Sequence, residues 1–136
     1  MVRPIVHDPL FLAQKSESAT RADAAVITDL KDTLRAHLEG CVGMAANMIG
    51  FKKRIIIFLN GPFPMIMVNP IITQKSGVYE TEEGCLSLAG TRKTKRYQKI
   101  TVSYQDEQFQ SRTGVFQGYA AQIIQHEIDH CDGILI

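Results

Sequence analysis

Two histidines and a glutamate stand close together near the end of the chain, at His126, Glu127 and His130. At roughly 100° per helical residue, the two imidazoles would project from almost the same face, at a spacing suited to one divalent ion. The Glu127 carboxylate could then act on a water without being a ligand itself. Residues 119–125 contain no Gly, Pro or Asn, and Gly118 is a suitable start signal. The pattern predicts a metal-binding helix, and an amphipathic helix with two incidental histidines is the alternative.

The residues alone leave the third metal ligand open. A catalytic metal site usually takes three protein ligands and leaves a fourth position for water. The other histidines are His7 and His37, whereas Cys85 offers a thiolate beside Gly84, between two strand-like runs. A lone cysteine is more often a small buried hydrophobe. A zincin-type peptidase also carries His-Glu-x-x-His, but it places its third ligand downstream, where only six residues remain.

Three blocks of the sequence together resemble the peptide deformylase family. They are Gly43-Met44-Ala45-Ala46-Asn47-Met48, Glu83-Gly84-Cys85-Leu86-Ser87 and His126-Glu127-Ile128-Asp129-His130. The blocks follow the family's order at similar spacings, and the similarity runs across nearly the whole chain. The resemblance implies one α+β domain over residues 1–136, with mostly antiparallel β-sheets around a C-terminal metal-binding helix.

The resemblance also implies a ligand set and a reaction. In the family, the cysteine and both histidines bind the metal and the glutamate moves protons. By position, Cys85, His126 and His130 are then the ligands and Glu127 is the acid/base. One divalent ion is expected, Fe²⁺ or Zn²⁺ with Ni²⁺ as a third candidate, because mixed soft and borderline ligands suit several ions. The implied reaction removes the N-formyl group from the N-terminal methionine of newly made proteins.

The first block departs from the family pattern Gly-x-Gly-Leu-Ala-Ala-Pro-Gln. Cys41 replaces the first Gly, Met44 the Leu, Asn47 the Pro and Met48 the Gln. In the family that Gln amide holds the developing oxyanion together with the backbone N–H corresponding to Leu86. A thioether cannot donate a hydrogen bond, and loss of one oxyanion donor typically costs about 10²–10³ in rate. We therefore expect a weak or specialised deformylase, with a protein that binds metal or formyl-peptides without useful turnover as the alternative.

The resemblance further implies where a substrate lies. The backbone around Gly43 and the edge formed by Glu83 and Gly84 would hold the peptide extended. An apolar pocket would accept the methionine side chain, and Ile123, one helical turn before the first metal histidine, is a candidate for its wall. By the same resemblance, Arg92 contacts the backbone of the bound peptide.

Residues 92–96 form a basic run that is typical of a solvated loop. The resemblance gives one member a second role, because Arg96 could pair with Asp129 and so fix the metal helix. Cys131, directly after the second metal histidine, is expected to be a helix residue or a buried thiol, and not a ligand.

Local patterns predict the remaining elements. Apolar residues close to a 3.6-residue repeat predict a helix over residues 24–38, and residues 1–20 are expected to form an extended arm across the domain. Pro70 suggests a break or an edge position. Strand-like runs occur at residues 54–59, 65–72, 77–81, 99–104 and 109–116.

Composition is that of an ordinary globular domain, with 136 residues, 45% hydrophobic residues and a formal net charge of +1. This charge gives no global attraction to nucleic acid or to a membrane, so no direct nucleic-acid site is predicted. Three cysteines without a Cys-x-x-Cys pair argue against a disulfide framework. No signal peptide or stretch of about 20 apolar residues is evident. We expect a soluble, cytoplasmic protein.

The implied partners are N-formylmethionyl peptides and nascent chains. Many bacterial deformylases continue past the metal helix into a C-terminal helix, which some of them use to dock on the ribosome. Because six residues follow His130, we expect weak ribosome contact at most.

Overall fold

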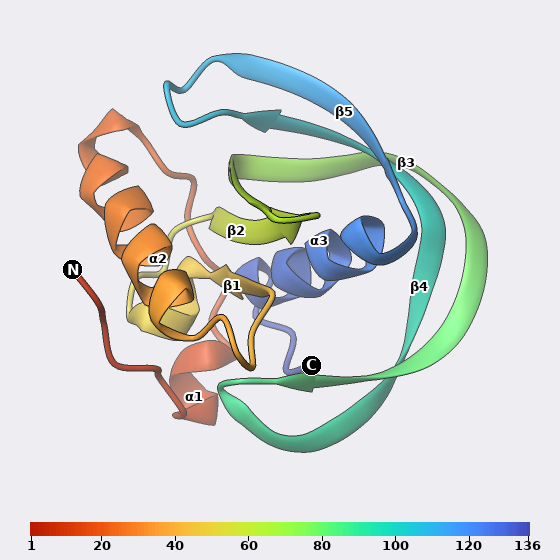
Figure 1. The fold of residues 1–136 in the computed structure, drawn as a ribbon, viewed down its shortest axis with the longest axis horizontal. Coiled ribbons are helices and arrows are strands. Elements are labelled where there is room, and N and C mark those ends of the chain that lie inside the picture. Colours follow the sequence, from red (N-terminus) through yellow and green to blue (C-terminus); the bar gives the residue numbers. More distant parts are fainter.

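The computed structural model describes residues 1–136 and contains one five-stranded antiparallel sheet with the order β1-β2-β3-β4-β5. The strands are β1 (Gly43–Ala45), β2 (Ile55–Asn60), β3 (Phe63–Cys85), β4 (Leu88–Gln105) and β5 (Ser111–Gln117). The helices are α1 (Pro9–Leu12), α2 (Ala24–Ala36) and α3 (Gly118–Cys131), with the 3₁₀-helices η1 (Arg21–Asp23) and η2 (Ala46–Ile49). Figure 1 shows β3 and β4 curving around α3, with α2 beyond β1 and β2. The predicted α+β fold is confirmed.

Strand β2 is buried on both faces because it lies between the two long helices. Ile55 and Ile57 pack in the cluster that includes α2, whereas Ile56 and Phe58 pack in the cluster that includes α3. Successive side chains of a strand point to opposite faces, so a strand covered on both sides needs a continuous apolar run. The strand predicted at residues 54–59 is confirmed.

Helix α2 begins directly after η1, which carries a capping box. The Thr20 N–H donates to the Asp23 carboxylate, and the Ala22 N–H donates to the Thr20 hydroxyl. The helix predicted over residues 24–38 is confirmed and ends at Ala36. Its buried apolar residues are Val26, Ile27, Leu30 and Leu34. None of the helices combines the length and apolar character that crossing a bilayer would require.

Strand β3 is one long, bulged strand, where the sequence indicated separate runs at residues 65–72 and 77–81. Asn69, just before Pro70, has a φ of 52°, and the register with β4 shifts at this point. Proline has no N–H to donate to a ladder, and a bulge accommodates it. The break suggested by Pro70 is therefore a bulge within a continuous strand.

The basic run at residues 92–96 lies in β4 and not in a solvated loop. Lys93 faces Glu82 and Lys95 faces Glu80 across the β3–β4 pair. Opposite charges on directly paired strand positions are favourable, so these lysines stabilise a strand instead of a loop.

The N-terminal segment, residues 1–20, crosses the domain as the sequence indicated. The Val6 N–H donates to the Met48 carbonyl at 2.8 Å, and the Ser16 N–H donates to the Cys131 carbonyl at 2.8 Å. The segment also contains α1, which was not predicted, because a helix of 4 residues is too short to produce a periodic pattern.

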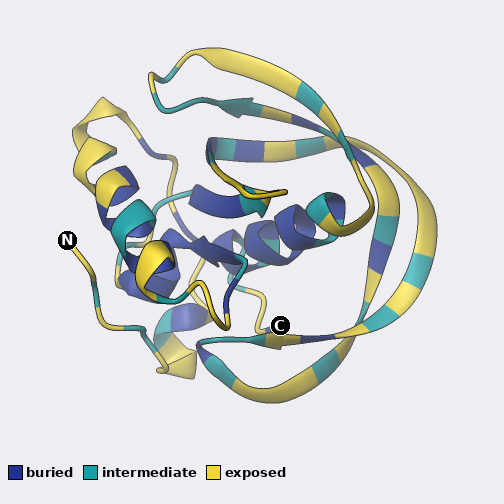
Figure 2. Cartoon of the chain, viewed as in Figure 1, coloured by how far each residue is buried: buried dark blue, intermediate teal, exposed yellow.

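One buried arginine ties the curved strands to α3. The Arg96 guanidinium contacts both carboxylate oxygens of Glu83, with Nη2 2.7 Å from Oε1 and Nε 3.0 Å from Oε2. Its Nη1 lies 2.7 Å from Oδ2 of Asp129, which confirms the predicted pair with the metal helix. Figure 2 shows that α3 and the short strands are buried, whereas the β3–β4 arc is largely exposed. The arginine therefore joins the arc to the core at a point shielded from solvent.

We predict that Arg96→Ala lowers the free energy of unfolding of the metal-free protein by about 3–5 kcal/mol, because it removes the guanidinium that pairs with both the buried Glu83 carboxylate and Asp129. Urea denaturation would measure this loss. Lys95→Ala, at an exposed neighbouring position, is the matched control and is expected to stay within about 0.5 kcal/mol of the parent. An Arg96→Ala protein as stable as this control would contradict the prediction.

Candidate metal centre

Three ligand-type side chains converge in the structure, from the end of β3 and from α3. The ligand atoms of Cys85, His126 and His130 all lie within 4.8 Å of one another. His130 Nε2 is 3.3 Å from Cys85 Sγ and 3.1 Å from His126 Nε2. The other two histidines lie in separate contacts, with His7 Nδ1 on the Ser87 carbonyl and His37 Nδ1 on its own helix. Of the candidates for a third ligand, the structure brings Cys85 to the pair.

The β3–β4 hairpin carries Cys85 at its tip. Cys85 is the last residue of β3 and pairs with Leu88, the first residue of β4, across a two-residue turn at Leu86 and Ser87. His7 Nδ1 donates to the Ser87 carbonyl at 2.9 Å and so fixes this turn from the N-terminal segment. The hairpin thus delivers the thiol, and the Leu86 backbone beside it, to α3.

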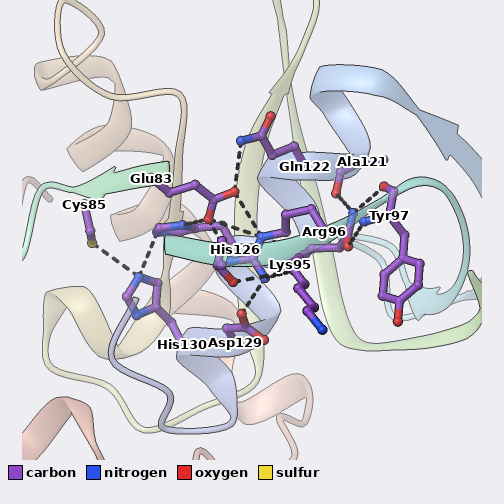
Figure 3. Close-up of polar contacts among 12 residues, drawn as sticks. Glu83, Cys85, Lys95, Arg96, Tyr97, Ala121, Gln122, His126, Asp129 and His130 are labelled. Atoms are coloured by element: carbon purple, nitrogen blue, oxygen red, sulfur yellow. Dashed lines mark hydrogen bonds and ion pairs between the residues drawn. The ribbon is translucent and has the colours of Figure 1, made fainter. Parts of the chain in front are cut away.

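Glu83 orients one of the two histidines. Its Oε1 accepts a hydrogen bond from His126 Nδ1 at 2.8 Å, which leaves Nε2 facing Cys85 and His130 (Figure 3). Although burial opposes it, hydrogen bonds from His126, Arg96 and Gln122 lower the pKa of Glu83 to about 2. The carboxylate is therefore ionised and holds the His126 ring.

The sequence did not predict this role of the Glu83 side chain. It predicted only that the backbone of Glu83 would help to hold a bound peptide. A usable signal existed, because residues two apart on a strand point to the same face, and Glu83 is two residues before Cys85. Two glutamines of α3 were also missed. Gln122 Nε2 donates to Glu83 Oε2 at 2.9 Å, and the Gln125 amide pairs with both backbone groups of Tyr97 on β4 at 2.9 Å.

The two imidazoles are in electrostatically different states. Although burial opposes protonation, hydrogen bonds to Cys85 and Glu83 raise the pKa of His126 to about 10. Burial and the neighbouring His126 charge lower the pKa of His130 to about 3. The pair therefore accommodates one positive charge and not two.

Glu127 is buried beside this pair with Oε1 unpaired. Burial raises the pKa of Glu127 to about 7, although the neighbouring His126 charge opposes the shift. The site therefore contains a thiol, two imidazoles and an unpaired buried carboxylate, and the raised pKa of His126 shows that it favours positive charge. This donor set fits Zn²⁺ or Fe²⁺. Carboxylates left unpaired in such a place are candidates for proton transfer.

A cavity of about 360 Å³ opens onto Cys85, His126 and Glu127, whereas His130 lies behind its wall and does not line it. Most of the predicted site residues line it, namely Gly43, Met48, Glu83, Gly84, Cys85, Leu86, Ile123, His126 and Glu127. The lining residues that were not predicted are Gly40, Cys41, Val42, Glu82, Tyr119 and Gln122. Arg92 does not line the cavity, and its Nη1 lies 3.5 Å from the Ala89 carbonyl, so its predicted peptide contact stays a prediction.

Met48 lies against the cavity at the end of η2. Its side chain is 2% exposed, so the thioether is almost fully enclosed by protein. The Ala45 N–H donates to Met48 Sδ at 3.4 Å. The sulfur therefore acts as an acceptor toward the protein's own backbone and offers no donor to a substrate.

The known proteins most informative about this geometry are peptide deformylases. The polypeptide deformylase family profile matches residues 2–136. A curated peptide deformylase of Clostridium beijerinckii is 60% identical over 136 residues, covering 100% of both chains. Another, from Pelodictyon phaeoclathratiforme, is 35% identical and covers 99% of this chain and 77% of its own.

Solved structures of peptide deformylases have the same fold. The Met-Ala-Ser-bound class I type b enzyme of Acinetobacter baumannii has a TM-score of 0.89 at 28% identity, over 99% of this chain and 97% of that one. The Thermotoga maritima enzyme has a TM-score of 0.89 at 29% identity, over 99% and 95% of the two chains.

These findings do not support the expectation of weak turnover, nor the alternative of metal binding without turnover. That expectation rested on Met48 alone, whereas the Cys85, His126 and His130 site is intact and the relative of equal length is a peptide deformylase. The family assignment has three agreeing lines of support, which are the full-length similarity, the shared fold and the complete set of three metal ligands. The chain belongs to the peptide deformylase family of metal-dependent hydrolases.

Proposed function

We propose that Cys85, His126 and His130 hold one Fe²⁺ or Zn²⁺ ion, with Ni²⁺ as a third candidate, and that the site removes the N-formyl group from N-formylmethionyl peptides. The observation that carries this proposal is the convergence of the three ligand atoms within 4.8 Å beside the unpaired Glu127 oxygen. A divalent ion in such a site supplies Lewis acidity and makes a water more acidic.

Glu127 is the acid/base group of the reaction. Its unpaired Oε1 accepts a proton from the attacking water and later delivers it to the leaving amine. A pKa of about 7 suits both steps, because the carboxyl group gains and loses a proton easily near neutral pH. Burial excludes bulk water from competing for this proton.

The Leu86 N–H donates to the formyl oxygen as the carbon becomes tetrahedral. Leu86 follows Cys85 in the hairpin turn and lines the cavity, which supports this role. Met48 provides no hydrogen-bond donor at the position where the family motif has a glutamine amide. The stabilisation of the oxyanion by protein groups therefore rests on the backbone of the turn.

Substrate binding uses the same cavity. The Acinetobacter baumannii relative was solved with Met-Ala-Ser bound, and another of its structures contains actinonin. By analogy, the cavity of about 360 Å³ takes an N-terminal methionine against Ile123, and the backbone at Gly43, Glu83 and Gly84 holds the peptide extended. Arg92 contacts the backbone of the bound peptide.

The physiological partners in this proposal are nascent chains in the cytoplasm, where formylated N-termini are made. Contact with the ribosome is weak, and no direct contact with nucleic acid is involved. The net charge of +1 supports this, because it provides no overall attraction to RNA.

Formate release from formyl-Met-Ala-Ser by the Fe²⁺-loaded protein tests the proposed reaction. We predict that Glu127→Gln lowers kcat by about 10²–10⁴-fold while metal content is unchanged, because the amide cannot accept and return the proton. Glu80→Gln, on the exposed face of β3, is the matched control and should release formate at the parent rate. Parent-like turnover by Glu127→Gln would overturn the role given to Glu127, and a parent that releases no formate would overturn the reaction.

A methyl group at Gly43 should displace the acid/base group. A Cβ at this residue would lie 2.9 Å from Glu127 Oε2 and 2.7 Å from Ile123 Cγ2. We predict that Gly43→Ala lowers kcat about 10²-fold, since small displacements of catalytic groups have effects of this size. In Gly40→Ala, the added Cβ meets nothing within 4 Å, and kcat should remain that of the parent. Equal rates for the two variants would contradict this account.

Metal uptake should release protons. His126, with a pKa of about 10, is protonated at neutral pH and must lose that proton to bind an ion. The apparent affinity for Zn²⁺ is therefore predicted to rise at least about tenfold per pH unit between about pH 6 and about pH 8. Competition with a chelator of known affinity measures this slope, and His37→Ala should leave it unchanged. An affinity that is independent of pH would refute the prediction.

A further inference from the structure

The two histidines of the candidate metal centre differ in how their second ring nitrogens are held. His126 Nδ1 donates to Glu83 Oε1 at 2.8 Å, whereas His130 Nδ1 is buried and has no hydrogen-bond partner. A neutral imidazole that binds a metal through Nε2 carries its proton on Nδ1, and that N–H normally donates to a fixed acceptor. His130 is 0% exposed, so bulk water cannot serve as this acceptor.

Asn47 on η2 contacts the backbone of His130 from outside α3. Its Nδ2 donates to the His130 carbonyl at 3.0 Å, across 83 positions of the sequence. Asn47 is also 0% exposed, and its Oδ1 has no hydrogen-bond partner. The Asn47 amide therefore donates to the His130 backbone, but its Oδ1 acceptor has no partner. The Nδ1 of the His130 ring likewise has no partner.

A third unpaired polar atom belongs to a residue that contacts the same end of α3. The Ser16 N–H donates to the Cys131 carbonyl at 2.8 Å, and the buried Ser16 Oγ has no partner. Buried polar groups are nearly always hydrogen-bonded, and a buried water typically makes about three hydrogen bonds to groups of this kind. Asn47 Oδ1, Ser16 Oγ and His130 Nδ1 supply two acceptors and one donor.

We propose that Asn47 is a positioning residue of the metal centre, whose Oδ1 receives the His130 Nδ1–H through one bridging water while its Nδ2 fixes the His130 carbonyl. This rests on the proposed binding of the metal by His130. Asn47 stands where the family motif has a proline, which has no side-chain polar atom, so the support of His130 by Asn47 is a feature of this chain. The two rings then have unlike supports, a carboxylate behind His126 and a neutral amide behind His130.

The test combines Zn²⁺ affinity, from chelator competition, with long-range ¹H–¹⁵N spectra that report which ring nitrogen carries the proton. In the Zn²⁺-loaded parent, we expect His130 to be protonated at Nδ1 with slow solvent exchange. Asn47→Leu, close to Asn in size but apolar, should bind Zn²⁺ about 10–100-fold more weakly and lose the slowly exchanging signal. Asn47→Asp, which keeps an acceptor oxygen, should retain the signal and bind Zn²⁺ more tightly than the leucine variant.

Thr33→Val removes a buried polar atom from α2, away from the metal centre, and controls for a general loss of stability. It should leave Zn²⁺ affinity unchanged. Parent-like affinity in Asn47→Leu would overturn the proposal, as would a His130 ring in the parent whose Nδ1 carries no proton or exchanges it rapidly. If Asn47→Asp loses as much affinity as Asn47→Leu, the effect belongs to the Nδ2 bond and the acceptor role is wrong. His130→Ala distinguishes failure of the Asn47 proposal from failure of the proposed metal site. Unchanged Zn²⁺ affinity in that variant would overturn the ligand set itself.

Discussion

Burial of the polar face of α3 is the constraint on which the rest of the structure depends. His126, Glu127 and His130 are all nearly inaccessible to solvent, and buried polar groups are costly unless other groups satisfy them. For His126 and Asp129 the partners come from β3 and β4, because Glu83 accepts from the His126 ring and Arg96 pairs with Glu83 and Asp129. The long hairpin curves around α3 and supplies these charges where the helix needs them.

The same curvature assembles the ligand set. Cys85 is 45 positions from His130, yet its sulfur lies 3.3 Å from the His130 ring, because the thiol stands at the tip of a hairpin whose other strand is tied to α3. On the side opposite the hairpin, strand β2 holds α3 in place, because α3 packs on one face of β2 and α2 packs on the other. Rigid elements on both sides hold the groups of the centre at close range.

The chemistry follows from unequal environments for similar groups. Glu83 is ionised because it receives hydrogen bonds, whereas Glu127 has a raised pKa because it is buried with one oxygen unpaired. One carboxylate therefore orients a ligand and the other is suited to moving a proton. Two imidazoles one helical turn apart differ in the same way, with opposite shifts in pKa. A peptide deformylase needs this division between groups that hold the metal and groups that transfer protons.

The sequence by itself determined the local elements, because each leaves a pattern in neighbouring residues. The spacing of His126 and His130 indicated the metal helix, and the apolar run of β2 indicated a buried strand. The third ligand stayed open on those grounds, with Cys85 among the candidates, and the resemblance to deformylases selected it. Tertiary structure decided the contact between Glu83 and His126, the strand at residues 92–96 and the contact between Asn47 and His130. These depend on packing between segments far apart in the chain, which no local pattern records.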